Sequence, residues 1–347
     1  MTPTQEAAAA NQDLEAFCER VHQMGHAVDR KRIPFFETRD WEAEDVMDVW
    51  AGKYARNIAM HYPDILASGH IGVLKDVAAG APVAVVGAGP SLDDNGAHLA
   101  DFPGLVVATD RAAKHLTARG LPVDLVVTVD PRQAVIAEML DYPEAARQAL
   151  VLSVYSAPDV AAAWRGKKLY ASTIHPGTQF HDRILPELFP GMPGLYATGN
   201  VGNTAVQVAA WLGAGPVVLV GQDYGYTGGR RHCQDYTHLP NCHDGTKPCW
   251  QAVPVDPEAE VEALSRRTGK LQVEGVWTYN AFVGYRDSLT QIAEANKLDV
   301  VNATEGGIIT QFPRRPLRAM ANTLRIKYPT AHIEARARLA QALGGIP

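Results

Sequence analysis

The sequence predicts an α/β protein with a doubly wound, mostly parallel sheet, a helical N-terminal cap and a helical C-terminal tail. Short apolar runs recur from residue 82 onward, and several end in a glycine or a polar residue. Helix-like segments such as residues 111–119 separate several of these runs. Such alternation is typical of parallel strands joined by right-handed crossovers.

Three segments follow from this texture. Residues 1–80 contain apolar positions at helical spacing and no alternating strand, so we expect a helical N-terminal cap there. Residues 81–312 form the sheet-containing core, interrupted by a long loop over residues 224–273, and residues 313–347 form a basic helical tail. The expected strands lie in the runs at 82–89, 105–110, 124–130, 149–156, 168–173, 216–223 and 299–304.

Composition excludes several classes of protein. Of the 347 residues, 46% are hydrophobic and 20% charged, and no apolar run reaches the roughly 18 residues of a membrane-spanning helix. The formal charge of -6 does not predict a nucleic-acid partner. The N-terminus lacks the basic start and apolar stretch of a secretory signal, so we expect a cytoplasmic protein. The oligomeric state stays open.

Carboxylates follow three of the expected strands, at Asp110, Asp130 and Asp223. In doubly wound sheets ligands bind beyond the carboxyl ends of the strands, where an acid can orient a ribose hydroxyl or bind Mg²⁺. The alternative for each is a helix cap. Asp130 is the strongest choice, because Pro131 stops its strand and exposes the carboxylate.

A glycine-containing loop follows the first expected strand and carries Gly87, Gly89, Ser91 and Asp93. Glycines let the backbone approach an anion and present amides to a phosphate. The third glycine of a dinucleotide fingerprint is absent and Pro90 removes an amide donor, so an ordinary NAD-binding loop is disfavoured. The alternative is a tight turn with a capped helix.

A second anion-competent loop holds Gly199, Asn200, Asn203 and Thr204, and the helix-like stretch 205–212 follows it. Free amides at a helix N-terminus bind phosphate or carboxylate. Capping alone is the other interpretation. Two such loops on one sheet favour a phosphate-rich ligand.

Three cysteines lie close together, Cys233, Cys242 and Cys249, among several histidines. Thiolates and imidazoles are ligands for tetrahedral zinc, which here would hold the loop together. The chain has no CxxC pair, so a polar loop with free thiols is the alternative.

Four ordered motifs resemble one known group of enzymes. They are GAGPSLD at residues 87–93, VDLVVTVDP at 123–131, the stretch from GNVGNTAV to YTGGRRH at 199–232, and VVNATEGG at 300–307. The set is similar to the core of the motility-accessory-factor (Maf) glycosyltransferases and of the archaeal 6-hydroxymethylpterin diphosphokinases called MptE. The resemblance extends over about residues 55–310.

The resemblance implies a Rossmann-like domain that handles nucleotides, with site residues assigned motif by motif. Gly87, Gly89, Ser91 and Asp93 match the nucleotide loop, Asp130 the strand-end acid, and Asn200 and Asn203 the second loop. Gln222, Asp223 and His232 match the GQD…H segment, and Asn302, Thr304 and Glu305 the NATEGG segment.

The function implied is glycosyl transfer of the Maf type, in which a nonulosonic acid moves from a CMP-activated donor to a hydroxyl on a protein or glycan. We expect His232 to be the general base, with His175 in reserve. One alternative is an MptE-like diphosphokinase that uses ATP with Mg²⁺. Another is a nucleotide-binding partner without turnover. The short flanks and the Cys/His insert leave the acceptor open.

Overall fold

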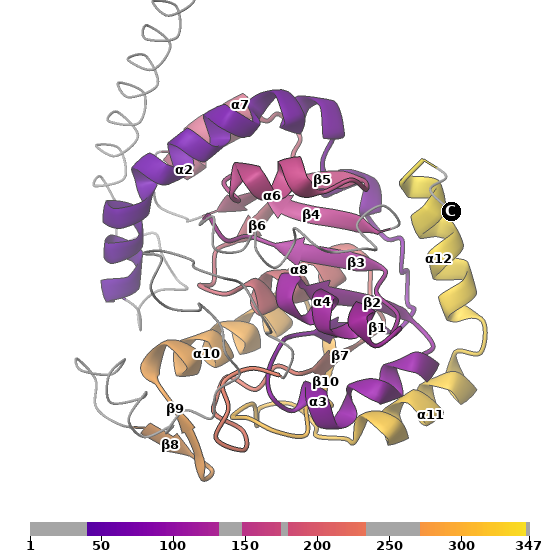
Figure 1. Ribbon diagram of the computed structural model, residues 1–347. Helices are drawn as coiled ribbons and strands as arrows, with labels where there is room; N and C mark the ends of the chain where they lie inside the picture. Colours follow the sequence, from indigo (N-terminus) through magenta and orange to yellow (C-terminus); the bar gives the residue numbers. More distant parts are fainter. Residues whose placement is uncertain (1–39, 132–147, 175–179, 234–270, 345–347) are drawn as a thin grey trace, which may run out of the picture.

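The computed structural model describes residues 40–131, 148–174, 180–233 and 271–344. Its centre is a parallel sheet of eight strands in the order β10-β7-β1-β2-β3-β4-β5-β6 (Figure 1). The strands are β1 (Val83–Val86), β2 (Leu105–Thr109), β3 (Leu125–Thr128), β4 (Ala149–Ser153), β5 (Lys168–Ile174), β6 (Gly194–Tyr196), β7 (Pro216–Val220) and β10 (Asp299–Asn302). The expected α/β fold with a doubly wound parallel sheet is therefore confirmed.

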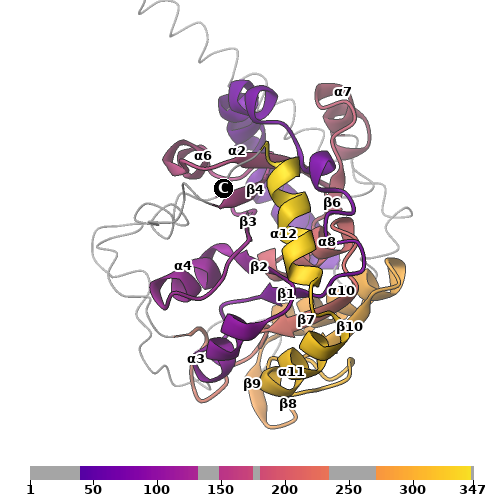
Figure 2. The same ribbon diagram turned by 90° about the vertical axis from the view of Figure 1, so that its right-hand side faces the viewer.

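Both faces of the sheet are buried, which explains why its strands are continuous apolar runs. Alternate residues of β1 belong to two separate hydrophobic clusters: Ala84 and Val86 to one, Val83 and Val85 to the other. The first cluster includes residues of α2 (Asp40–Ser68), α4 (Asp110–Ala118), α6 (Pro158–Ala163) and α11 (Leu317–Lys327). The second includes residues of α8 (Val201–Trp211), α10 (Asn280–Ala295) and α12 (Ala331–Ala342). Figure 2 shows α4 and α8 on opposite sides of the sheet.

The remaining described elements are short. They are η2 (Ile71–Leu74), α3 (Leu92–Asn95), η3 (Gly96–Asp101), the π-helical turn η6 (Phe180–Ile184), α7 (Leu185–Leu188) and the antiparallel hairpin of β8 (Leu271–Val273) and β9 (Val276–Thr278). None of the helices among the described residues combines the length and the apolar composition of a membrane-spanning segment.

The side of the sheet on which new strands are added changes at β1. From β1 to β6 each new strand is added on one side, and after α8 the chain returns to place β7 and then β10 on the other side of β1. The carboxyl ends of β1 and β7 thus form the topological switch point, where doubly wound sheets bind ligands. The two glycine-containing loops and the GQD segment all lie at this edge.

The structure describes the predicted C-terminal tail up to residue 344 but only part of the predicted N-terminal cap. The basic tail forms two helices, α11 and α12, as expected, and Figure 1 places α12 beside the edge opposite to the arrowheads of the strands. In the N-terminal segment α2 spans Asp40–Ser68 and agrees with the helical prediction. The helix-like stretch 14–24 lies outside the described residues.

Candidate functional site

Two loops are joined at the switch point: residues 87–91 after β1 and residues 221–223 after β7. The amide of Gly87 donates to the carbonyl of Val220 at 2.9 Å, and that of Gly89 to the carbonyl of Gly221 at 2.8 Å. A Cβ on Gly89 would lie 1.9 Å from Oδ2 of Asp223, so this contact requires glycine. The glycines of the GAGPSLD motif therefore allow the loops to pack against each other.

Asp223 is the centre of this junction. Its carboxylate accepts hydrogen bonds from Ser91 Oγ at 2.7 Å and from Thr227 Oγ1 at 2.5 Å, and the residue is 2% exposed. Burial raises the pKa of Asp223 to about 6, against the lowering effect of the two hydroxyls and Arg230. These contacts suit a positioning role better than direct contact with a substrate.

The NATEGG segment contacts the loop after β7 at this junction. Thr304 Oγ1 accepts from the backbone amide of Gln222 at 3.2 Å. Asn302 donates from Nδ2 to the carbonyl of Ile309 and accepts at Oδ1 from the amide of Thr304. Glu305 accepts from the amide of Leu317 at 2.8 Å, near the start of α11. The segment thus fixes the GQD backbone, and the side chains of Asn302 and Thr304 are buried, whereas Glu305 is exposed.

The N-terminus of α8 lies beside Gln222. Asn200 is its N-cap, and its Oδ1 accepts from the amide of Asn203 at 2.9 Å. A Cβ on Gly202 would lie 2.4 Å from Oε1 of Gln222, so the glutamine side chain rests on the first turn of the helix. Gln222 is 3% exposed, and within the described ranges its Nε2 and the Nδ2 of Asn200 have no hydrogen-bond partner.

Other members of the second loop are structural. Asn203 is fully buried, donates from Nδ2 to the carbonyl of Tyr285 and accepts at Oδ1 from Tyr224 Oη at 2.7 Å. Tyr224 has a φ of 48°, a conformation that costs energy for a residue with a side chain. Thr204 is also buried and donates to the carbonyl of Asn200.

A group of aromatic residues lies on β9 and in the first half of α10. Phe282 and Tyr285 are partly buried and pack against the core, and their rings lie 6.2 and 6.3 Å from that of Tyr224. These two side chains therefore lie beside the N-terminus of α8.

The segment that follows Asp223 turns back toward the first loop. Thr227 and Arg230 form an antiparallel bridge around Gly228 and Gly229, both with positive φ. The amide of Cys233 then donates to the carbonyl of Ala88 at 3.0 Å. The turn brings His232 beside α4.

His232 contacts Arg111, a residue that the motif analysis did not single out. Arg111 Nη1 lies 3.0 Å from Nε2 of His232, and because a guanidinium only donates, Nε2 is the acceptor and the ring is neutral. Burial and the charges of Arg111 and Arg231 hold the pKa of His232 well below its ordinary value. Arg111 follows a strand-end acid directly, which is the signal that would have found it.

The two other strand-end acids differ in their surroundings. Asp110 begins α4, is 5% exposed and accepts from Thr128 Oγ1 and from the Arg111 amide, both at 2.8 Å. Burial raises its pKa against these contacts. Asp130 is only partly buried, so its carboxylate is the more accessible of the two.

Some candidates lie elsewhere or outside the described residues. Asp93 lies on the short α3 and pairs with Arg230. His175, Cys242 and Cys249 are outside the described residues, so the zinc site built on the three cysteines stays a prediction.

Comparison with known proteins supports the family resemblance that the four motifs indicated. The model of the family described as 6-hydroxymethylpterin diphosphokinase MptE-like matches residues 56–229, half of the chain. Among solved structures, the chain is similar to a Maf glycosyltransferase from Magnetospirillum magneticum AMB-1, with a TM-score of 0.51 and 14% sequence identity. That similarity covers 88% of this chain and 48% of the other, so this chain spans about half the length of the solved relative. No curated protein matches the chain.

Proposed function

Since the chain belongs to the family described as 6-hydroxymethylpterin diphosphokinase MptE-like, we propose that it is a nucleotide-dependent transferase with its donor at the switch point of the sheet. We propose further that it is a glycosyltransferase of the Maf type. Its donor is then a CMP-activated sugar, a nonulosonic acid, and its acceptor is a hydroxyl on a protein or glycan.

The observation that carries this proposal is the group of unused donors at the α8 N-terminus. The Nε2 of Gln222 and the Nδ2 of Asn200 lie at the end of the helix that carries the positive pole of its dipole. Burying an amide donor without a partner is costly, so a ligand acceptor is the expected compensation. A phosphate supplies such oxygens.

The burial of the carboxylates supports glycosyl transfer over diphosphoryl transfer. Asp110 and Asp223 are buried, and each accepts hydrogen bonds from two neighbouring groups. A Mg²⁺ site needs carboxylate oxygens that face the ligand phosphates. Of the three strand-end acids only Asp130 is partly exposed, which favours charge neutralisation by arginines and amides over a multi-carboxylate metal site.

In this mechanism the acceptor hydroxyl loses a proton as it attacks the anomeric carbon, and the bond to the CMP phosphate breaks with its electrons on the phosphate. The amides of Gln222 and Asn200 stabilise that leaving charge. The base is His232 or Asp130. His232 is neutral, the form that a base requires, but its Nε2 accepts a proton only after the contact with Arg111 opens.

The diphosphokinase remains the second candidate because the family description names that activity. The two candidates are distinguished by which nucleotide stabilises the protein and by whether that effect needs Mg²⁺. We expect CMP and CTP to raise the thermal midpoint without Mg²⁺, since a ligand at 100 times its dissociation constant adds about 2.7 kcal/mol to the free energy of unfolding. Stabilisation by ATP or AMP that depends on Mg²⁺ would overturn the glycosyltransferase and support the diphosphokinase.

One substitution tests the site itself, against a control elsewhere in the chain. Gln222→Glu puts a negative charge where the phosphate is proposed and removes the nucleotide-induced shift, while the positive end of the α8 dipole offsets part of the cost of burying that charge. The matched control is Gln341→Glu, exposed near the end of α12. An unchanged nucleotide shift in Gln222→Glu would place the donor elsewhere.

Turnover separates an enzyme from a binding partner without activity. We expect removal of the base by Asp130→Asn or His232→Gln to lower the transfer rate by about 10²–10⁴-fold while nucleotide binding persists. The variant that loses the rate identifies the base. Full activity in both variants would refute the proposed mechanism.

A further inference from the structure

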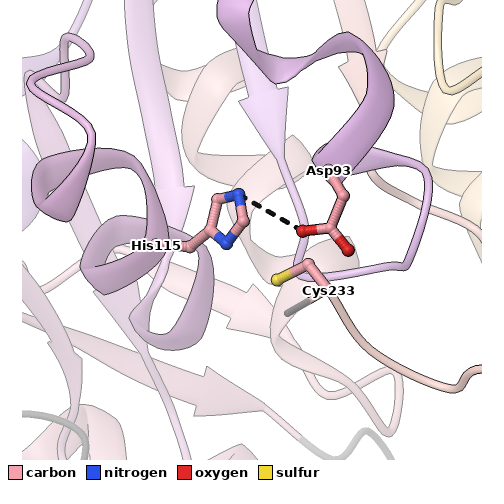
Figure 3. Close-up of side chains that lie close together, drawn as sticks. All are labelled: Asp93, His115 and Cys233. Carbon is pink, nitrogen blue, oxygen red and sulfur yellow. Dashed lines mark ion pairs between the residues drawn. The ribbon is translucent and has the colours of Figure 1, made fainter. Parts of the chain in front are cut away.

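Three side chains that bind transition metals converge beside the switch point: Asp93, His115 and Cys233 (Figure 3). They come from α3, from α4 and from the segment that ends the turn after β7. Their ligand atoms all lie within 4.8 Å of one another. Figure 3 shows the carboxylate and the sulfur both near the imidazole ring.

We propose that Asp93, His115 and Cys233 bind one divalent transition-metal ion of the Zn²⁺ class. Zinc takes sulfur, imidazole nitrogen and carboxylate oxygen at about 2.0–2.3 Å, which sets its ligand atoms roughly 3.3–3.8 Å apart. The Nε2 of His115 lies 3.7 Å from Oδ1 of Asp93, at that spacing. Three protein ligands leave one tetrahedral position for water.

Burial distinguishes this cluster from a chance group of surface side chains. Cys233 is fully buried, and the side chains of His115 and Asp93 are 3% and 12% exposed. Metal binding requires the Cys233 thiolate. A bound cation stabilises the thiolate, and binding then releases one proton per metal from this group.

The surroundings provide outer support for the ligands. Arg230 pairs with Oδ2 of Asp93 and leaves Oδ1 directed toward His115. Metal-ligating carboxylates are commonly held by such an outer hydrogen bond. The backbone of Cys233 is fixed by its bond to Ala88. A metal here would join α3 and α4 to the segment that carries Arg230 and His232, and so hold that side of the proposed donor site.

The site differs from the zinc site predicted from sequence, which used Cys242 and Cys249 with Cys233. The new set takes its other ligands from residues 93 and 115, more than 100 residues earlier in the chain. The two hypotheses share one cysteine and are separable by substitution.

The test is titration of the metal-free full chain with Co²⁺ as a spectroscopic probe for Zn²⁺, followed by competition with Zn²⁺. We expect one Co²⁺ per chain, with a thiolate-to-cobalt charge-transfer band and proton release. Cys233→Ser abolishes the band, and His115→Gln and Asp93→Asn weaken binding by more than the roughly 10–100-fold typical of outer partners. Arg230→Gln, which removes an outer partner, weakens Co²⁺ binding by roughly 10–100-fold.

The matched control is the double variant Cys242→Ser/Cys249→Ser, which we expect to bind Co²⁺ like the parent. Loss of the band in the double variant with retention in His115→Gln and Asp93→Asn would overturn the proposal. No charge-transfer band in the parent would overturn it as well. Circular dichroism checks that each variant is folded, and the readout does not depend on transferase activity.

Discussion

Side chains at the switch point divide into those that are hydrogen-bonded within the protein and those that we propose bind a ligand. Asp223 belongs to the first group, since Ser91 and Thr227 donate to it and it is 2% exposed. Gln222 belongs to the second, with its Nε2 without a partner among the described residues. The two neighbours share one motif, but only the Asp223 carboxylate is hydrogen-bonded by side chains of the described residues at both of its oxygens.

Asp223 gives a pH prediction. Its pKa is about 6 in the folded protein and 3.8 as an ordinary value, so the folded state binds the proton more tightly. The free energy of unfolding therefore falls as pH rises from about 4 to about 6, by up to about 3 kcal/mol from this group. Asp223→Asn removes this contribution. The stability of the variant relative to the parent therefore increases as the pH rises across that window.

The measurement is denaturant unfolding at several values between pH 4 and 7. Asp101→Asn is the control, since the Asp101 side chain is 71% exposed and the same substitution there leaves the pH dependence close to the parent's. A difference between Asp223→Asn and parent that stays constant with pH would contradict the prediction.

His232 offers a second prediction at this scale. Burial lowers its pKa most, and the charges of Arg111 and Arg231 lower it further. Arg111→Gln removes one charge, so the pKa of His232 rises toward its ordinary value while burial still keeps it low. NMR titration of the His232 ring checks this, with Arg318→Gln, exposed on α11, as the control. An unchanged His232 titration would show that the contact has no electrostatic effect.

At the scale of elements, α8 is positioned by its first turn. Gly199 precedes the Asn200 cap with a φ of 79°, and a Cβ there would lie 2.4 Å from the ring of Tyr285. The glycine therefore satisfies two requirements: the left-handed backbone and the close approach of α10.

Gly199→Ala should lower the free energy of unfolding by more than the about 1–2 kcal/mol of the left-handed conformation alone, because the Tyr285 ring must also move. Gly191→Ala is the matched control, with a φ of 77° and open space around its Cβ position. Chemical denaturation compares them. Equal losses in the two variants would mean that Tyr285 moves at no cost.

Two short β elements were not predicted: strand β6 of the parallel sheet and the separate β8–β9 hairpin. β6 has three residues, Gly194–Tyr196, and the β8–β9 hairpin has three per strand. Segments this short show no periodicity, so their pairing partners determine them. The longer predicted runs all contain strands, but Asp110 begins α4 and does not end β2.

For the whole molecule, the C-terminal tail is part of the folded core. Leu339 and Ala335 of α12 belong to the second hydrophobic cluster, and Arg336 pairs with Asp124, just before β3. Leu339→Ala should cost about 2–5 kcal/mol. Ile333→Ala on the same helix is the control, since Ile333 is 60% exposed and its loss stays within about 0.5 kcal/mol. A Leu339→Ala variant as stable as the parent would make the tail an independent segment.

The sequence by itself determined the class of sheet and the edge at which we propose that a ligand binds. Apolar runs such as those of β1 and β7 reveal strands buried on both faces, and the glycine loops after them mark the carboxyl edge. What the tertiary structure decided was which polar groups at this edge remain free. Asp110, Asp223 and Asn203 are taken up by partners distant in sequence, and Asp93, His115 and Cys233 meet only through folding. Local patterns encode strands and turns, whereas hydrogen-bond partners and metal ligands depend on how distant segments pack.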